Sequence, residues 1–358
     1  MASTPVAPAA TLNRRALPKS KAGCVTCKQR RVKCDETRPS CERCNIGGRE
    51  AGLGSQASGR FDAFHMALFY HAVLNMASYM ALDGDMAPII ECALDNAVTA
   101  PYLLDQMLAV AALHHSVVDR ANSRAYHHHA TSLQNRALGQ FNDASDKLTD
   151  PNIIPSFLFA TFLGYHVLRN TLADHQGSIS SFVGAFVDYL HVHRGTRVVT
   201  RQHWPQIEKS SLAPLLEISS IGKAIDNRQP GPETQTLLAH LQAQPDHASS
   251  SSTAACIDAL LWAQWVLNIQ KRKPPRFSVK VHAATAWPLV VPDEFVSALY
   301  QRRPEALAVL AHYLAILHVT REFWVFEPCE FGMIQALADH VGPFWEKALQ
   351  WPLSCKSG

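Results

Sequence analysis

The chain has 358 residues, of which 47% are hydrophobic and 18% are charged, an ordinary balance for a packed protein that excludes a wholly disordered chain. The longest apolar stretch, residues 153–168, is too short and too polar to span a membrane and predicts a buried core helix. Charge is uneven, because residues 1–50 carry 11 Lys and Arg against 4 Asp and Glu, whereas the rest carries 22 against 26. This asymmetry indicates a polyanionic partner for the N-terminal segment.

The first 18 residues are rich in Ala, Pro, Ser and Thr and predict a disordered tail. They lack the apolar segment of a secretory signal, so we expect a soluble, intracellular protein. Basic residues around the end of the tail are suited to binding the DNA backbone and to serving as a nuclear import signal. They are Arg14, Arg15, Lys19 and Lys21.

A cluster of cysteines follows the tail. Five of the nine cysteines fall within 21 residues, in the order C-x2-C-x6-C-x6-C-x2-C, at Cys24, Cys27, Cys34, Cys41 and Cys44. Thiolates bind Zn²⁺ tetrahedrally, and a C-x2-C pair converges two sulfurs on one ion. The surrounding residues are charged and offer no core that would bury unliganded cysteines. Without an oxidising compartment, the pattern therefore predicts a zinc site and not a disulfide framework.

The run KAGCVTCKQRRVKCDETRPSCERC resembles the fungal binuclear zinc-cluster domain of transcription factors, in which six cysteines hold two zinc ions. The resemblance implies that Cys24 and Cys41 bridge the two ions. It implies that Cys27 and Cys34 complete the first site and that Cys44 serves the second. It further implies a sequence-specific, DNA-binding regulator of RNA polymerase II transcription that works in the nucleus with the transcription machinery.

One position departs from the family pattern. A sixth cysteine is expected six to eight residues after Cys44, but Ala51, Gly52 and Leu53 stand there. The second zinc would then have three thiolates, with water or Glu50 as its fourth ligand and a weaker site as the result. A short segment missing between residues 45 and 60 is another explanation. The departure also leaves open a regulator that no longer binds DNA and acts through protein contacts.

Four positive charges lie in the six residues between Cys27 and Cys34. In the resembled family this segment is a short helix that enters the major groove at a CGG-like half-site. Arg and Lys can donate to O6 and N7 of guanine, while neighbouring cations hold phosphates. We assign base contacts to Arg30 and Arg31. Phosphate contact or support is assigned to Lys28, Lys33 and Arg43.

The remaining chain has helical texture, so the predicted fold is mainly α, with a small N-terminal zinc-cluster module and a large all-helical regulatory domain. The predicted domains are a tail at 1–18, an incomplete zinc-cluster domain at 19–52, a linker at 53–60 and a helical domain at 61–355. Strand-like alternation is limited to residues 197–200 and 277–281. No sustained heptad repeat is present, so a homodimer would form without an evident coiled coil.

Several helix boundaries can be placed along this domain. Pro101 and Pro304 suit the first turns of two helices. Asp150 and Asn152 are candidate caps for a helix at 157–168, and Asp293 is a candidate cap for one at 294–301. The serine-rich segment at 244–253 predicts an exposed loop.

The helical domain resembles the regulatory domain of sterol uptake control proteins and similar regulators, through stretches such as PYLLDQMLAVAALHHSV and SFVGAFVDYLHVHRGTRVV. The resemblance implies target genes of lipid, sterol or secondary metabolism and an apolar small-molecule effector. Aromatics at helical spacing are more often plain core, but nine are candidates to line a pocket. They are Phe157, Phe159, Phe162, Phe182, Phe186, Tyr313, Phe323, Trp324 and Phe326.

The scattered histidines have no recognised ligand spacing, so surface or satisfied core positions are expected for them. No sequence motif of a common enzyme class is present, so we expect no catalytic activity.

Overall fold

The computed structural model describes residues 27, 32–36, 61–145, 152–174, 178–216, 228–243, 251–273 and 276–356. The chain divides into two compact units, Met1–Met66 and Ala67–Gly358. The sequence-based boundaries at residues 18, 52 and 60 lie outside the described residues and stay predictions. Within the described ranges every regular element is helical, as the sequence predicts.

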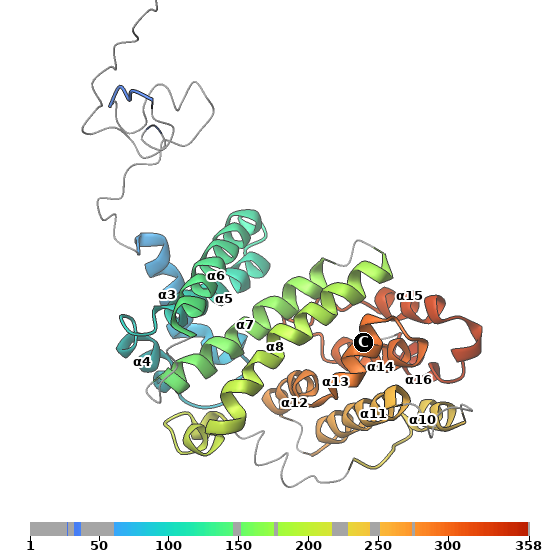
Figure 1. Ribbon diagram of the computed structural model, residues 1–358. Coiled ribbons are helices and arrows are strands. Elements are labelled where there is room, and N and C mark those ends of the chain that lie inside the picture. Colours follow the sequence, from blue (N-terminus) through green and yellow to red (C-terminus); the bar gives the residue numbers. More distant parts are fainter. Residues whose placement is uncertain are drawn as a thin grey trace, which may run out of the picture. The chain divides into compact units, whose positions relative to one another are not determined.

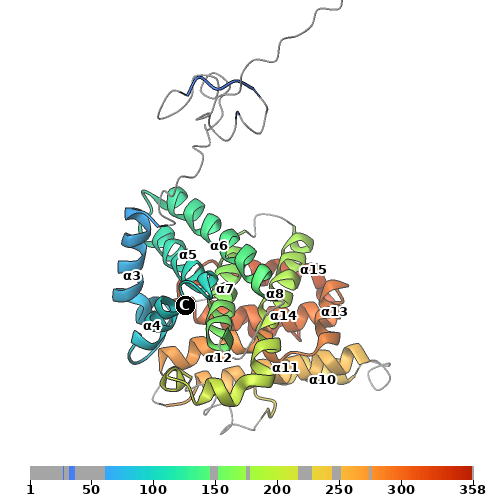
Figure 2. The same cartoon turned by 60° about the vertical axis from the view of Figure 1, so that its left-hand side comes forward.

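The second unit is built from helices that surround one apolar core (Figures 1 and 2). In chain order the α-helices are α3 (Ala63–Tyr79, which begins in the first unit), α4 (Ala87–Asp95), α5 (Pro101–Val118), α6 (Ser123–Ser145), α7 (Ile153–Ala173), α8 (Ile179–Glu208), α10 (Gln235–Gln242), α11 (Ser251–Gln270), α12 (Phe277–Val290), α13 (Asp293–Tyr300), α14 (Pro304–Val319), α15 (Phe331–Val341) and α16 (Gln350–Ser354). Two short 3₁₀ turns are η2 (Ala213–Leu215) and η3 (Pro343–Trp345).

The long helices α7 and α8 lie side by side and form the middle of this unit (Figures 1 and 2). On one side α7 packs against α5, and α5 packs against α6. On the other side α8 packs against α12 and α13. Both of these helices pack against α11, and α13 also packs against α14. The pair α7 and α8 therefore lies between the two groups of helices and contacts both.

Two helices, α5 and α14, form the centre of the core, because their side chains are buried almost all the way round. Helix α14 is buried at every position from Ala306 to His318. A helix that is apolar on all sides must be enclosed by other helices, and α14 contacts α10, α11, α13, α15 and α16. Pro101 and Pro304 occupy the first turns of these two helices, as predicted from the sequence.

The predicted helix caps are not formed as expected. Asn152 stands at the N-cap of α7, but its side chain makes no capping hydrogen bond, and Asp150 lies outside the described residues. Pro292, not Asp293, occupies the N-cap of α13, and Asp293 is already the first helical residue. There its carboxylate still interacts favourably with the helix dipole, which explains the acidic residue without a cap.

Three loop or strand expectations are corrected by the structure. Residues 197–200 lie in α8, and residues 277–281 open α12. Burial of Val279 and Val281 within α12 accounts for the β-branched residues there, since packing overrides weak local propensity. The expected loop at 244–253 ends earlier than predicted, because α11 begins at Ser251; residues 244–250 lie outside the described residues.

One glycine in α7 marks a close approach between helices. A Cβ on Gly164 would lie 2.6 Å from Cε1 of His193, a buried residue of α8. The same imidazole is held from its other side, since its Nε2 lies 3.2 Å from the carbonyl oxygen of Thr285 on α12. Gly164 thus gives the His193 ring the space to bridge α8 and α12.

This close approach predicts an unusual response to a glycine-to-alanine change. We expect Gly164→Ala to lower the free energy of unfolding by about 1–3 kcal/mol, because the added methyl overpacks the core. The matched control is Gly184→Ala in α8, where nothing lies within 4 Å of the new Cβ; it should stabilise the chain by about 0.5–1 kcal/mol. Urea unfolding measures both, and an equal gain in both variants would contradict the close approach.

Candidate functional site

The first candidate site is the cysteine-rich segment of the first unit. Cys27 and Cys34 are 1% and 4% exposed, although charged residues surround them in sequence. The backbone N–H of Val32 donates to the carbonyl oxygen of Cys27 at 3.0 Å. The N–H of Glu36 points at Sγ of Cys34 at 3.4 Å. This is the kind of outer support that orients a metal-ligating side chain.

The donor set fits zinc where the structure describes it. Two buried sulfurs, one with a backbone N–H directed at it, supply the soft anionic ligands that Zn²⁺ prefers. Lys33, between these cysteines in sequence, is exposed. The other predicted ligands and DNA contacts lie outside the described residues. They are Cys24, Cys41, Cys44, Lys28, Arg30, Arg31 and Arg43.

The four remaining cysteines are in a different environment. Cys256 and Cys329 are buried in the helical core, and burial raises the pKa of the Cys256 thiol to about 12 and that of Cys329 still further. Burial also raises the pKa of Cys92 to about 11 and raises the pKa of Cys355. In the absence of a metal ion these thiols therefore stay protonated at neutral pH.

Within the described ranges, no group of three or more His, Cys, Asp or Glu side chains is arranged to hold a metal ion. Several histidines instead serve the core: Nδ1 of His312 lies 2.9 Å from the Ala308 carbonyl oxygen, and Nδ1 of His318 lies 2.8 Å from that of Cys329. The expectation of satisfied core positions is met only in part, because both ring nitrogens of His166 and Nε2 of His318 are buried with no hydrogen-bond partner in the described part of the chain.

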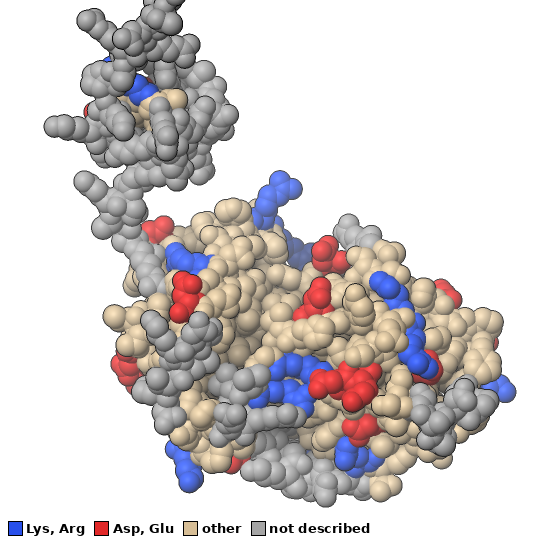
Figure 3. Space-filling view, in the orientation of Figure 1, with Lys and Arg blue, Asp and Glu red and all other residues tan. Residues whose placement is uncertain are grey.

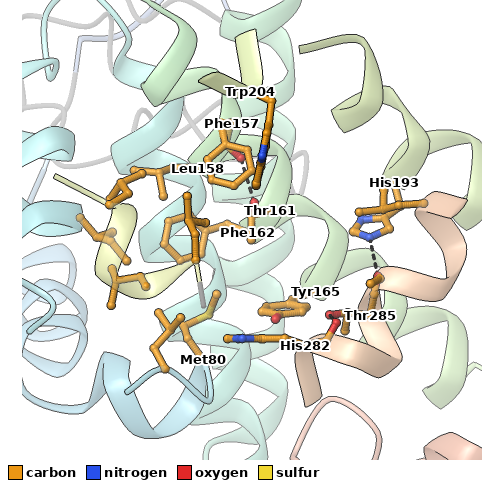
Figure 4. A pocket seen from close by; sticks show the side chains of 17 residues that line it. Met80, Phe157, Leu158, Thr161, Phe162, Tyr165, His193, Trp204, His282 and Thr285 are labelled. Carbon is orange, nitrogen blue, oxygen red and sulfur yellow. Dashed lines mark hydrogen bonds between the residues drawn. The ribbon is translucent and has the colours of Figure 1, made fainter. Parts of the chain in front are cut away.

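The second candidate site is an apolar pocket of about 260 Å³ between α7, α8, α12 and the η2 turn (Figure 4). This volume lies near the lower end of the range for small-molecule sites, about 300–1,000 Å³. Its lining combines aliphatic and aromatic side chains with a few polar ones. The lining residues are Met80, Leu82, Ile89, Phe157, Leu158, Thr161, Phe162, Tyr165, His193, Trp204, Leu212, Leu215, Leu216, His282, Thr285, Ala286 and Leu289.

The two ends of the pocket differ in chemistry. Phe157 and Trp204 meet edge to face at one end, with ring centroids 6.4 Å apart. Tyr165, His282 and Thr285 lie toward the other end (Figure 4). Burial lowers the pKa of His282, so its imidazole is neutral at pH 7. The pocket therefore offers an apolar enclosure with a neutral polar end.

The aromatic residues predicted as a pocket lining are mostly core. Only Phe157 and Phe162 line the cavity. The others are packed elsewhere; Tyr313, for example, stacks on Trp287 with ring centroids 4.1 Å apart. Periodicity missed Trp204, His282 and the leucines in and beside η2, because the pocket is assembled from six separate segments. The site is recognisable only in the folded structure, where these segments pack together.

Comparison with known proteins places the first site within a known domain. The family model of the fungal Zn(2)-Cys(6) binuclear cluster domain matches residues 22–50. Residues 22–50 are a zinc-cluster domain of this family. The match contains both described cysteines, Cys27 and Cys34, and a domain of this family implies zinc binding.

The curated relatives agree with this assignment. A Zn(2)-C6 fungal-type transcription factor of Gibberella zeae is 26% identical over 267 residues, which cover 70% of this chain and 52% of the relative. The transcription factor lfc1 of Flammulina velutipes is 45% identical over 56 residues, 15% of this chain and 20% of the relative. The chain thus spans about half the length of the first of these relatives and a smaller part of the second.

The zinc-cluster domain retains the sequence departure noted above. Its name specifies six cysteines, whereas residues 22–50 contain five. No cysteine follows Cys44 until Cys92, which lies in α4 of the second unit with a raised thiol pKa. Cys92 thus belongs to the helical unit and lies outside residues 22–50.

Proposed function

We propose that this protein is a zinc-dependent, sequence-specific DNA-binding regulator of RNA polymerase II transcription that acts in the nucleus. The observation that carries the proposal is the zinc-cluster domain at residues 22–50, which encloses a strongly basic segment. The name of each relative matched, whether along most of the chain or over a short segment, describes a transcription factor or transcription regulator.

The face of the helical unit seen in Figure 3 lacks the positive charge expected of a DNA-binding surface. Lys and Arg side chains there lie beside Asp and Glu, and no broad area of one sign is formed. Duplex DNA attracts a protein through many Lys and Arg contacts to phosphate. The face in view therefore offers no extended positive surface for DNA.

In this proposal Cys24, Cys27, Cys34 and Cys41 form the first zinc site, and Cys44 joins the bridging thiolates at the second. Zinc supplies no reaction here; it fixes the fold of a module that is too small to have a core of its own. Arg30 and Arg31 would read guanines of a CGG-like half-site. Lys28, Lys33 and Arg43 would hold phosphates.

A substitution in the basic segment tests the division of roles. We expect Arg31→Ala to weaken binding to the preferred site by about 1–3 kcal/mol and to relax selectivity at one base pair. Lys33→Ala is the matched control, because loss of a phosphate contact weakens binding to all sequences alike and lowers the salt slope. Binding to a panel of duplexes at several salt concentrations measures both. An unchanged site preference in Arg31→Ala would refute its assignment.

The missing sixth cysteine supports a second candidate function. A second zinc site with three thiolates would be weak, and a distorted module would leave a regulator that acts through protein contacts alone. Native mass spectrometry of the full chain with Zn²⁺ decides between them. Two zinc ions per chain support the DNA-binding proposal, with water or Glu50 completing the second site; one ion or none favours the protein-contact regulator.

For the pocket of the helical unit we propose an apolar small-molecule effector with a single polar group. The enclosure by Phe157, Phe162 and Trp204 suits the apolar part, and His282 or Thr285 suits the polar group. Genes of lipid, sterol or secondary metabolism are the proposed targets. One short-range relative is named as a regulator of the aspercryptin biosynthesis cluster of Emericella nidulans, with 59% identity over 32 residues.

A pocket-filling variant tests the effector proposal. Ala286 lines the pocket, so Ala286→Phe should block an uncharged fluorescent apolar probe such as N-phenyl-1-naphthylamine and weaken its binding at least tenfold. Ala77→Phe on α3, outside the pocket lining, should leave probe binding unchanged. Titration of both variants with the probe gives the answer, and equal binding would reject the pocket as the site.

A further inference from the structure

The lining of the pocket between α7, α8, α12 and η2 contains no charged side chain. None of its residues, all of which the structure describes, is Lys, Arg, Asp or Glu. Its polar groups are the imidazoles of His193 and His282, the hydroxyls of Thr161, Tyr165 and Thr285, and the indole of Trp204. A charged ligand group among these residues would be buried without an opposite charge, which is costly.

An anion suits the polar end of the pocket least, because the charge that acts on His282 is itself negative. Burial lowers the pKa of His282, and the nearby carboxylate of Asp83 opposes this shift only in part. Asp83 accepts hydrogen bonds from Arg276 and Ser278, neither of which lines the pocket. A ligand carboxylate at this end would therefore meet a neutral imidazole and a like charge.

Most hydrogen-bond donors of the lining are already used within the protein. The Thr161 hydroxyl donates to the carbonyl oxygen of Phe157 at 2.9 Å, and the Thr285 hydroxyl donates to that of His282 at 3.2 Å. Nε2 of His193 lies 3.2 Å from the Thr285 carbonyl oxygen. Since a carbonyl oxygen only accepts, the imidazole supplies the proton of this bond. These three donors are therefore satisfied without a ligand.

His282 and Tyr165 are the groups that remain to select a ligand. His282 forms a hydrogen bond with the backbone of Met80 that favours its protonated form, so the ring donates an N–H there. In the neutral imidazole the second ring nitrogen is then an acceptor. Burial raises the pKa of Tyr165 to about 12, so its phenol stays a neutral O–H group. A ligand hydroxyl can donate to the imidazole and bond to the phenol, whereas a ketone or an ether can only accept.

The size of the pocket limits the ligand further. Its volume of about 260 Å³ lies below the roughly 300–1,000 Å³ of cavities that enclose drug-sized molecules. A sterol, with four fused rings and a side chain, is a molecule of drug size. A single alkyl chain is smaller and can follow the aromatic lining from the polar end toward Phe157 and Trp204 (Figure 4).

We propose that the pocket binds a medium-chain aliphatic alcohol, with its hydroxyl at His282 and Tyr165 and its chain toward Phe157 and Trp204. This assignment rests on the proposed effector site and specifies the ligand class. It excludes fatty-acid anions, because no cation lines the pocket, and it excludes sterols, because the cavity is too small.

Competition against N-phenyl-1-naphthylamine on the purified full chain tests the ligand class. Nonanol, octanoate and methyl octyl ether have the same number of non-hydrogen atoms and differ in the polar group. We expect nonanol to displace the probe at a concentration at least tenfold below that of octanoate and at least threefold below that of the ether. Cholesterol delivered in cyclodextrin should not displace the probe.

Substitution of His282 tests the role of its acceptor nitrogen. We expect His282→Leu to reduce the preference for nonanol over methyl octyl ether to less than twofold, because leucine accepts no hydrogen bond. His240→Leu on α10 is the matched control, the same change outside the pocket lining, and should keep the preference. Partial unfolding lowers the amount of protein that binds either ligand and leaves their ratio unchanged, so a loss of stability does not imitate this result.

The outcomes separate the ligand class from the site. Equal displacement by nonanol and the ether, or by nonanol and octanoate, would overturn the alcohol assignment and leave the pocket as an effector site. Displacement by cholesterol would overturn the size limit. If Ala286→Phe binds the probe as the parent does, the pocket is rejected as the effector site and the alcohol assignment fails with it.

Discussion

Replacement of Arg136 by methionine should lower the free energy of unfolding by about 3 kcal/mol. Asp105 on α5 is fully buried, and its two carboxylate oxygens accept hydrogen bonds from Nε and an Nη of Arg136 on α6, both at 2.8 Å. Gln140 donates a further bond to Asp105 at 2.8 Å. Without the guanidinium, the buried carboxylate loses its main compensating charge. Removal of one partner from a buried ion pair is strongly destabilising because it leaves such an uncompensated charge.

The double variant Asp105→Leu/Arg136→Met separates charge from packing. If the cost comes from the uncompensated carboxylate, removal of both partners should recover at least half of the lost stability. Denaturant unfolding of both single variants and the double variant gives the coupling free energy. Additive losses would show that the pair contributes packing alone.

Acidification should destabilise the helical unit at pH values well above those at which carboxylates titrate. Burial lowers the pKa of His166 to about 3 and the pKa values of His193 and His312 to about 4. These side chains are neutral in the folded state, whereas the unfolded chain takes up protons near pH 6.5. The stability that they contribute is therefore complete above pH 6.5 and is lost as the pH falls from 6.5 toward 4.

The size of this effect is comparable with the whole stability of a domain. Lowering a histidine pKa from 6.5 to about 4 corresponds to roughly 3 kcal/mol, and the lower pKa of His166 corresponds to somewhat more, whereas native domains are stable by about 5–15 kcal/mol. Tryptophan fluorescence reports the unit directly, because all seven tryptophans follow residue 200. We expect the melting temperature to fall steadily between pH 6.5 and 5. His166→Leu should flatten this fall, and a constant melting temperature over that range would contradict the account.

The sequence predicts the helical class and the positions of several helices because the signals are local. Prolines at 101 and 304 stand where a missing N–H costs nothing, and the apolar residues that follow recur at helical spacing. The cysteine spacing likewise specifies a zinc module without reference to the rest of the fold. These features can be predicted without knowing which segments contact one another in the folded chain.

The errors arise where tertiary packing decides. The alternation at 277–281 belongs to a helix whose first turns bury Val279 and Val281. Asn152 has the right position for a cap, yet its side chain is not used. The pocket could not be predicted because its lining depends on how α7, α8, α12 and η2 meet. The contact of His193 with Gly164 depends on the same arrangement and has no local signal.

The most direct test of the central claim is the binding of the purified full chain to a duplex with CGG half-sites, compared with a scrambled duplex. We predict selective binding that persists at physiological salt, disappears when a chelator removes zinc and returns when Zn²⁺ is added back. Equal affinity for both duplexes, or binding that ignores the chelator, would contradict the account. Attraction of the basic N-terminal segment to any polyanion would then explain all binding to DNA.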